Sequence, residues 1–195
     1  MFDAPSLFYL SNRATIDEWA SLRSNVADAL GDWYRRVLPG ALAPGAEARG
    51  LQISEARGPS SYHHVVLHPP FTPMPAGKPV IGIGIAWPAK SVDPAGNSTF
   101  ACVRCSRNAT GREAARRFLD AGGRAFRDAT ARAKGADQDT WPVYWWVTAG
   151  ERWWTDLDAY CQLLVNEVVR MVDALRDPLD VASAVELIDA DEEEA

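Results

Sequence analysis

The chain lacks the motifs that identify most enzymes. Its 195 residues contain neither a Gly-x-Ser-x-Gly elbow nor a Gly-Lys-Thr/Ser phosphate loop. The Gly-x-Gly formed by Gly82 and Gly84 stands within an apolar run rather than after one, and no third glycine follows it. A nucleotide fingerprint is therefore absent, and we assign neither catalytic residues nor a cofactor from sequence.

Membrane and disulfide signals are also scarce. No apolar run approaches 18 residues, which is the length expected of a membrane span. The N-terminus has neither the basic nor the apolar segment of a signal peptide. Three cysteines are an odd number and do not predict a disulfide framework. We therefore expect a cytoplasmic protein with no membrane partner.

What the chain does contain is ample material for a core. Hydrophobic residues make up 47% of it and include eight tryptophans. The length fits one domain, which we place at residues 1–180, followed by an acidic tail at residues 181–195.

Charge is distributed unevenly. Residues 100–140 hold nine basic and five acidic side chains, whereas residues 141–195 hold three and thirteen. This asymmetry can steer a charged partner, although two solvated faces of opposite sign would give the same pattern.

Hydrophobic spacing predicts three helices, at residues 15–38, 111–134 and 153–175. In the first, apolar residues recur at steps of three and four and form one apolar face; they are Ile16, Trp19, Leu22, Val26, Leu30, Trp33 and Val37. Thr15 is the expected N-cap, and Pro39-Gly40 the expected end. Thr110 is the expected cap of the second helix, which Gly122-Gly123 should bend. Asp177-Pro178 should end the third.

Alternating apolar residues predict strands at 61–68, 80–87, 98–106 and 141–148, with a further short strand possible at 51–55. Residues 69–79 hold five prolines and should form neither strand nor helix. The expected fold is α+β, in the order α-β-β-β-α-β-α. It has a mixed or antiparallel sheet of about four strands and a long C-terminal helix.

This order of elements resembles the PD-(D/E)XK nucleases. The resemblance implies metal-binding acids on the second strand and an acid-x-lysine on the third. Neither residues 80–87 nor residues 100–105 contain an acid, and no Asp-x-Lys or Glu-x-Lys occurs in the chain. The resemblance thus implies a relative that keeps binding without catalysis. One alternative function is therefore nucleic-acid binding through Arg112, Arg116, Arg124 and Arg127.

A small metal-dependent hydrolase is a further alternative. Cys102 and Cys105 have C-x-x-C spacing, and His64 and His68 could complete four zinc ligands. Residues three apart in a strand point to opposite faces, however, which argues against a shared metal.

The pairs Trp145-Trp146 and Trp153-Trp154 give the strongest positive signal. Exposed tryptophans anchor protein interfaces. The alternation of the strand predicts that Trp146 faces outward, and the apolar stripe of the last helix predicts the same for Trp153. The acidic run of Glu192, Glu193 and Glu194 could add electrostatic steering. We favour a non-catalytic intracellular binding or regulatory protein, similar in class to immunity proteins and defence modulators. It would contact another protein or a second copy of itself.

Overall fold

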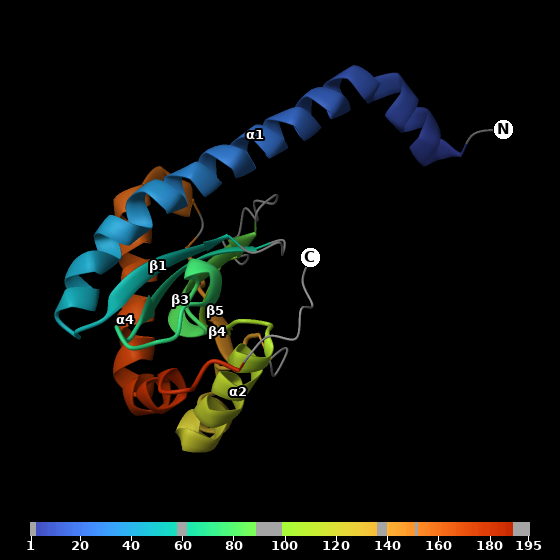
Figure 1. Ribbon diagram of the computed structural model, residues 1–195. Coiled ribbons are helices and arrows are strands. Elements are labelled where there is room, and N and C mark those ends of the chain that lie inside the picture. Colours follow the sequence, from blue (N-terminus) through green and yellow to red (C-terminus); the bar gives the residue numbers. More distant parts are fainter. Residues whose placement is uncertain (1–2, 58–61, 89–98, 136–139, 151, 189–195) are drawn as a thin grey trace.

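The computed structural model describes residues 3–57, 62–88, 99–135, 140–150 and 152–188. Along the chain the helices and strands are α1 (Ala4–Glu47), β1 (Gln52–Arg57), β2 (Tyr62–His68), β3 (Ile81–Pro88), β4 (Phe100–Cys105), α2 (Ala109–Phe118), α3 (Arg124–Ala129), β5 (Val143–Trp146) and α4 (Leu157–Ser183). Short 3-10 turns, η1 (Pro75–Gly77) and η3 (Trp153–Thr155), and a π-helical turn, η2 (Leu119–Gly123), complete the order. The α+β class and the long C-terminal helix are confirmed (Figure 1).

The sheet is an antiparallel meander in the order β1-β2-β3-β4-β5. It has five strands rather than about four, because the short run after residue 50 pairs with β2 along its whole length. Its register sets His64 beside Ala86 and Ala86 beside Phe100, and Phe100 in turn lies beside Trp146. Alternate residues of every strand therefore share a face.

The helices pack on one face of this sheet. The main core joins side chains of α1, α2 and α4 to the strand residues that point toward them, such as Ile83, Ile85 and Trp145. A smaller cluster on the opposite face contains Ala86, Phe100 and Cys102, with Trp141 and Tyr144 packed against it. Strict alternation over the expected strand at 141–148 would place Trp141 on the face of Val143 and Trp145. It lies on the other face, because it precedes the strand itself.

Helix α1 is much longer than predicted. It begins at an Asp3 N-cap, whose carboxylate accepts a hydrogen bond from the Ser6 amide, so Thr15 lies inside the helix. It also continues through Pro39 and Pro44 to Glu47. A proline inside a helix costs about 3 kcal/mol. Burial of Leu38, Leu42 and Ala46 in the core offsets that cost.

The other two helices also differ from prediction at their ends. The N-cap of α2 is Asn108 rather than Thr110. The expected bend at the two glycines is present as the π-helical turn, in which Gly122 has a φ of 123°. Helix α4 continues past Pro178 because its backbone breaks at Leu175. Pro178 then lies in the first turn after the break, where its missing N–H is not needed.

The end of the described chain stays attached to the body. The expected domain boundary at residue 180 falls inside α4, and Ala182 and Val185 beyond it are buried. The Ile188 amide donates a hydrogen bond to the Thr110 hydroxyl over 3.0 Å. The body therefore extends at least to Ile188. The acidic run at residues 192–194 lies outside the described residues.

Candidate protein-binding surface

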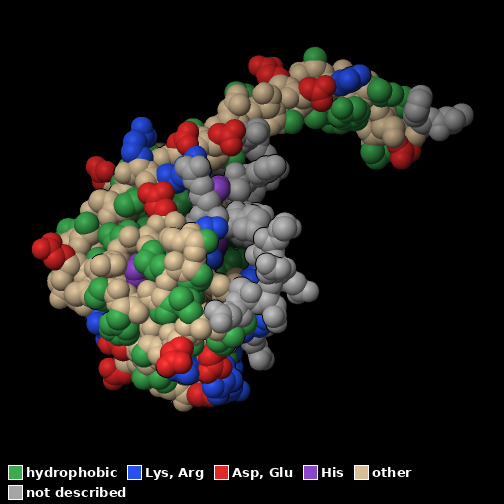
Figure 2. All heavy atoms as spheres, viewed as in Figure 1, with side chains coloured by type: hydrophobic (Ala, Val, Ile, Leu, Met, Phe, Trp, Pro, Cys, Tyr) green, Lys and Arg blue, Asp and Glu red, His purple; other side chains and the backbone are tan. Residues whose placement is uncertain are grey.

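The N-terminal half of α1 projects beyond the body of the molecule (Figure 1). We call residues 4–26 the arm. None of its described side chains is buried, and Trp19 is 65% exposed and Leu22 53% exposed. Apolar side chains gather along this projection (Figure 2). Exposed apolar surface that is contiguous on a soluble protein commonly marks an interaction site.

Two apolar rows run along α1. The inner row faces the sheet and consists of Tyr34, Leu38, Leu42 and Ala46. The outer row is the part of the face recognised from sequence that follows Ile16, and it consists of Trp19, Leu22, Val26, Leu30, Trp33 and Val37. Its first three members are exposed, and its last three are only partly buried against the core. The first half of the outer row therefore contributes no buried side chain to the fold.

The outer row continues into a groove where α1 meets the start of α4. This α1–α4 groove has a volume of about 510 Å³ and apolar lining; the lining residues are Val26, Ala29, Leu30, Trp33, Trp153, Trp154 and Leu157. Pockets of roughly 300–1,000 Å³ are of the size that holds a bound ligand or an anchoring side chain. None of the described residues that line the groove is charged, so apolar contact would dominate binding there.

Of the two tryptophan pairs, one prediction of exposure holds and one is wrong. Trp146 is 36% exposed on the outer face of the sheet. In the second pair Trp154 is the exposed member, at 50%, whereas Trp153 packs on the core. The 3-10 turn explains the exchange, because residues 153–155 precede α4 and do not follow its periodicity. Both Trp153 and Trp154 nevertheless line the groove.

A buried polar network supports the groove from below. The Tyr34 hydroxyl lies 3.0 Å from Thr99 Oγ1 and 2.9 Å from the Tyr160 hydroxyl. Burial raises the pKa of Tyr34 and of Tyr160 above the usual tyrosine range. The Tyr160 ring packs 4.4 Å from that of Trp153 and 6.2 Å from that of Trp33. The network thus joins α1, α4 and the sheet beneath the groove wall.

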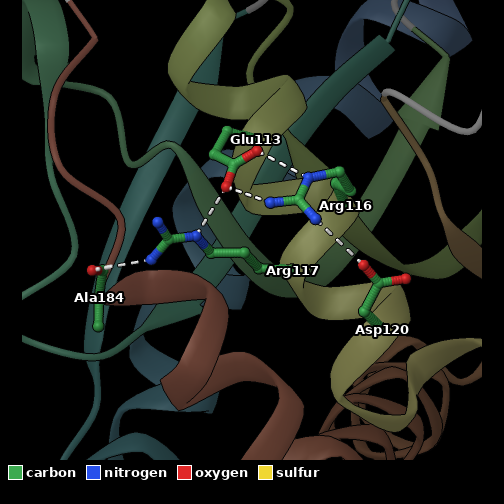
Figure 3. Close-up of polar contacts among 5 residues, drawn as sticks. All are labelled: Glu113, Arg116, Arg117, Asp120 and Ala184. Atoms are coloured by element: carbon green, nitrogen blue, oxygen red, sulfur yellow. Dashed lines mark hydrogen bonds and ion pairs between the residues drawn. The ribbon is translucent and has the colours of Figure 1, made fainter.

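The four arginines of the nucleic-acid alternative already have partners, and Figure 3 shows those of Arg116. Arg116 donates to Glu113 over 2.7 and 2.9 Å and to Asp120 over 3.3 Å. Arg124 pairs with Asp120 and Arg127 with Asp128, while Arg112 donates to the Arg107 carbonyl. Three of these four arginines thus already pair with carboxylates of the protein. Phosphate binding would have to displace these pairs.

The four candidate zinc ligands do not converge. Cys102 lies in the outer cluster and Cys105 in the main core, on opposite faces of β4. His64 and His68 are four residues apart on β2, which separates them by roughly 13 Å. Burial raises the pKa of the Cys102 thiol to about 12, so the thiolate form that binds metal is disfavoured. Among the described residues, no three His, Cys, Asp or Glu side chains are grouped to hold a metal ion.

A serine–histidine pair on the outer face was not foreseen from sequence. The Ser54 hydroxyl lies 2.9 Å from His68 Nε2, and His68 Nδ1 lies 2.9 Å from the Pro69 carbonyl. Because a carbonyl can only accept, Nδ1 carries the proton and Nε2 accepts from Ser54. Burial lowers the pKa of His68 and keeps the ring neutral. The pair links β1 to β2, and its two residues are 14 apart in the chain, too far for a local motif to reveal.

Comparison of the chain with protein-family models, with curated proteins and with solved structures gave no match. None of the helices within the described residues combines the length and apolarity needed to cross a bilayer. The geometry described above is therefore the basis for a functional assignment.

Proposed function

We propose that this chain is a non-catalytic binding protein that acts through protein–protein contact. The observation that carries the proposal is the outer row of α1, which is apolar, exposed over its first half and continuous with the α1–α4 groove. A partner that covered this surface would remove Trp19 and Trp154 from water, and buried tryptophans contribute strongly to binding. The action of the protein would be occlusion of the surface that its partner presents.

The proposal extends to a regulatory role inside the cell, as for immunity proteins or defence modulators. Support comes from the ion-paired arginines and the separated cysteines and histidines, which leave apolar contact as the better-supported mode of recognition. The acidic C-terminal segment, with three basic and thirteen acidic residues after position 140, would favour a basic partner and speed the encounter.

The test compares three single variants of the affinity-tagged chain, purified under native conditions from cells that produce it naturally. Trp154→Ala removes an anchor of the groove, Trp146→Ala an exposed ring of the opposite sheet face, and Phe71→Ala an equally exposed ring on a loop. We expect Trp154→Ala to reduce the amount of bound protein, measured by native mass spectrometry, at least tenfold, because loss of a central anchor costs about 2 kcal/mol or more.

Phe71→Ala is the control and should retain the bound protein. Circular dichroism should show that all three variants are folded, because the side chains removed are exposed. Loss of the bound protein only with Trp146→Ala would transfer the binding surface to the outer face of the sheet. Equal retention by all three variants would contradict the proposal.

A further inference from the structure

The occupant of the groove can be inferred from α1 itself. Resting on the proposed function, we infer that the arm of a second copy of this chain lies in the α1–α4 groove, so that two α1 helices pair antiparallel about a twofold axis. One chain carries both halves of such a contact, since the exposed part of the outer row can fill the groove that the remaining part lines. An isologous contact of this kind closes a dimer.

The spacing of the outer row specifies a register. In an antiparallel pair centred on residue 27, Trp19 of one helix lies between Trp33 and Val37 of the second copy. In the same register Leu22 lies between Leu30 and Trp33 of the second copy. Each apolar side chain thus enters a space between two partners, which is the packing of paired helices. The paired segment, residues 19–37, is about 27 Å long on each helix.

The charges beside the row agree with that register. Glu18 and Arg36 are 18 residues apart, which is about five helical turns, so both lie on the same side of α1. Centring the pair on residue 27 sets Glu18 of each helix opposite Arg36 of the other. Both side chains are exposed, and neither forms an ion pair with the residues that the structure describes. Apolar packing and charge thus independently select the same alignment.

The composition of the arm disfavours a lipid surface as occupant. Helices that lie on membranes carry an excess of Lys and Arg on their polar face. Residues 4–26 hold two basic side chains, Arg13 and Arg23, and two acidic ones, Asp17 and Glu18. Arg13 and Asp17 are already paired over 3.3 Å. The second copy offers the matching apolar row and the opposite charges together.

The experiment measures the mass of the purified full chain by sedimentation equilibrium. We expect twice the chain mass of 21.3 kDa. Leu22→Asp should raise the dissociation constant by at least about a hundredfold, because it buries two unpaired carboxylates per dimer. Leu187→Asp, at a leucine of similar exposure outside α1, is the control and should leave the dimer intact.

A charge exchange tests the register without touching the apolar row. Glu18→Arg alone should weaken the dimer by about tenfold, because two opposite-charge contacts become like-charge contacts. Combining Glu18→Arg with Arg36→Glu should restore it. A dimer that both Leu22→Asp and the charge exchange leave unchanged would overturn the inference.

The inference would also be overturned if the chain were a monomer that binds a different protein and loses it on Trp154→Ala. The proposed function would then stand. A monomer that binds nothing through Trp154 would contradict both.

Discussion

Gly84 lies where strands β2 and β3 approach too closely for a side chain. A Cβ atom built on it would stand 1.8 Å from the Val65 carbonyl oxygen. A row of small residues can accommodate either a helix or a neighbouring strand. In β3 the small residues leave space for the neighbouring strand β2. The added Cβ would clash with the backbone of β2. That strand cannot move away without breaking its hydrogen bonds to β1.

We therefore expect Gly84→Ala to lower the free energy of unfolding by about 1–3 kcal/mol or more, as overpacked cores do. Gly40→Ala is the matched control, because nothing lies within 4 Å of a Cβ at that exposed position of α1. It should instead raise the stability by roughly 0.4–1 kcal/mol, since alanine is the better helix former. Urea unfolding followed by circular dichroism measures both. Equal midpoints for the two variants would contradict this assignment.

Helix α2 packs on the body through buried Ala114, Ala115 and Phe118, and it carries a charged cluster on its solvent side. Glu113 accepts hydrogen bonds from Arg116 and Arg117, and Arg117 also reaches the Ala184 carbonyl after α4 (Figure 3). The hydrogen bonds from the two guanidinium groups lower the pKa of Glu113 from 4.5 to about 2. A carboxylate with a lowered pKa stabilises the fold above its unfolded pKa and loses that effect as pH falls toward its folded pKa.

Glu113→Gln should therefore destabilise the protein at pH 7, by no more than about 1 kcal/mol because the cluster is open to solvent. The difference between the wild type and the variant should shrink as pH falls from 4.5 toward 2. Urea midpoints measured across this range test the sign. Asp128→Asn on α3, whose carboxylate meets only Arg127 in the described structure, is the comparison and should show a smaller difference. A difference that grew on acidification would refute the assignment.

Whether a segment is a helix or a strand was predictable from sequence wherever a single hydrophobic pattern continued without interruption. Alternation located β2, β3 and β4, because each strand is a compact run of β-branched or apolar residues between turns. The ends of the helices were not predictable from sequence, because they depend on packing in the tertiary structure. Pro39 and Pro178 are ordinary stop signals. Burial of Leu42 outweighed the first, and the backbone break at Leu175 accommodates the second.

The candidate site was foreseen only in part. The outer row of α1 was visible as a period of three and four residues, yet periodicity does not say whether an apolar face meets the core or a partner. Only the structure makes that distinction. It shows that the core contacts of α1 come from the inner row, which includes Tyr34 and Leu38. The groove wall at Trp154 lies 120 residues after Tyr34 in the chain, and no local signal joins such distant positions.

At the scale of the whole molecule, stability and association should be linked. The body folds around the inner row, whereas none of the described side chains in residues 4–20 is buried in the free chain. If the arm packs only in a second copy, then dimer formation adds free energy that depends on protein concentration. Unfolding of the full chain should accordingly be harder at high concentration than at low concentration.

We expect the midpoint of thermal unfolding of the full chain to rise by several degrees over roughly a hundredfold increase in concentration. A chain that lacks residues 1–26 should have a midpoint independent of concentration and close to that of the dilute full chain, because none of the described side chains of the arm is buried in the body. Scanning calorimetry at matched concentrations measures both. A truncated chain that unfolded well below the dilute full chain would show that the arm belongs to the fold, and the exposed outer row would then need another explanation than a partner.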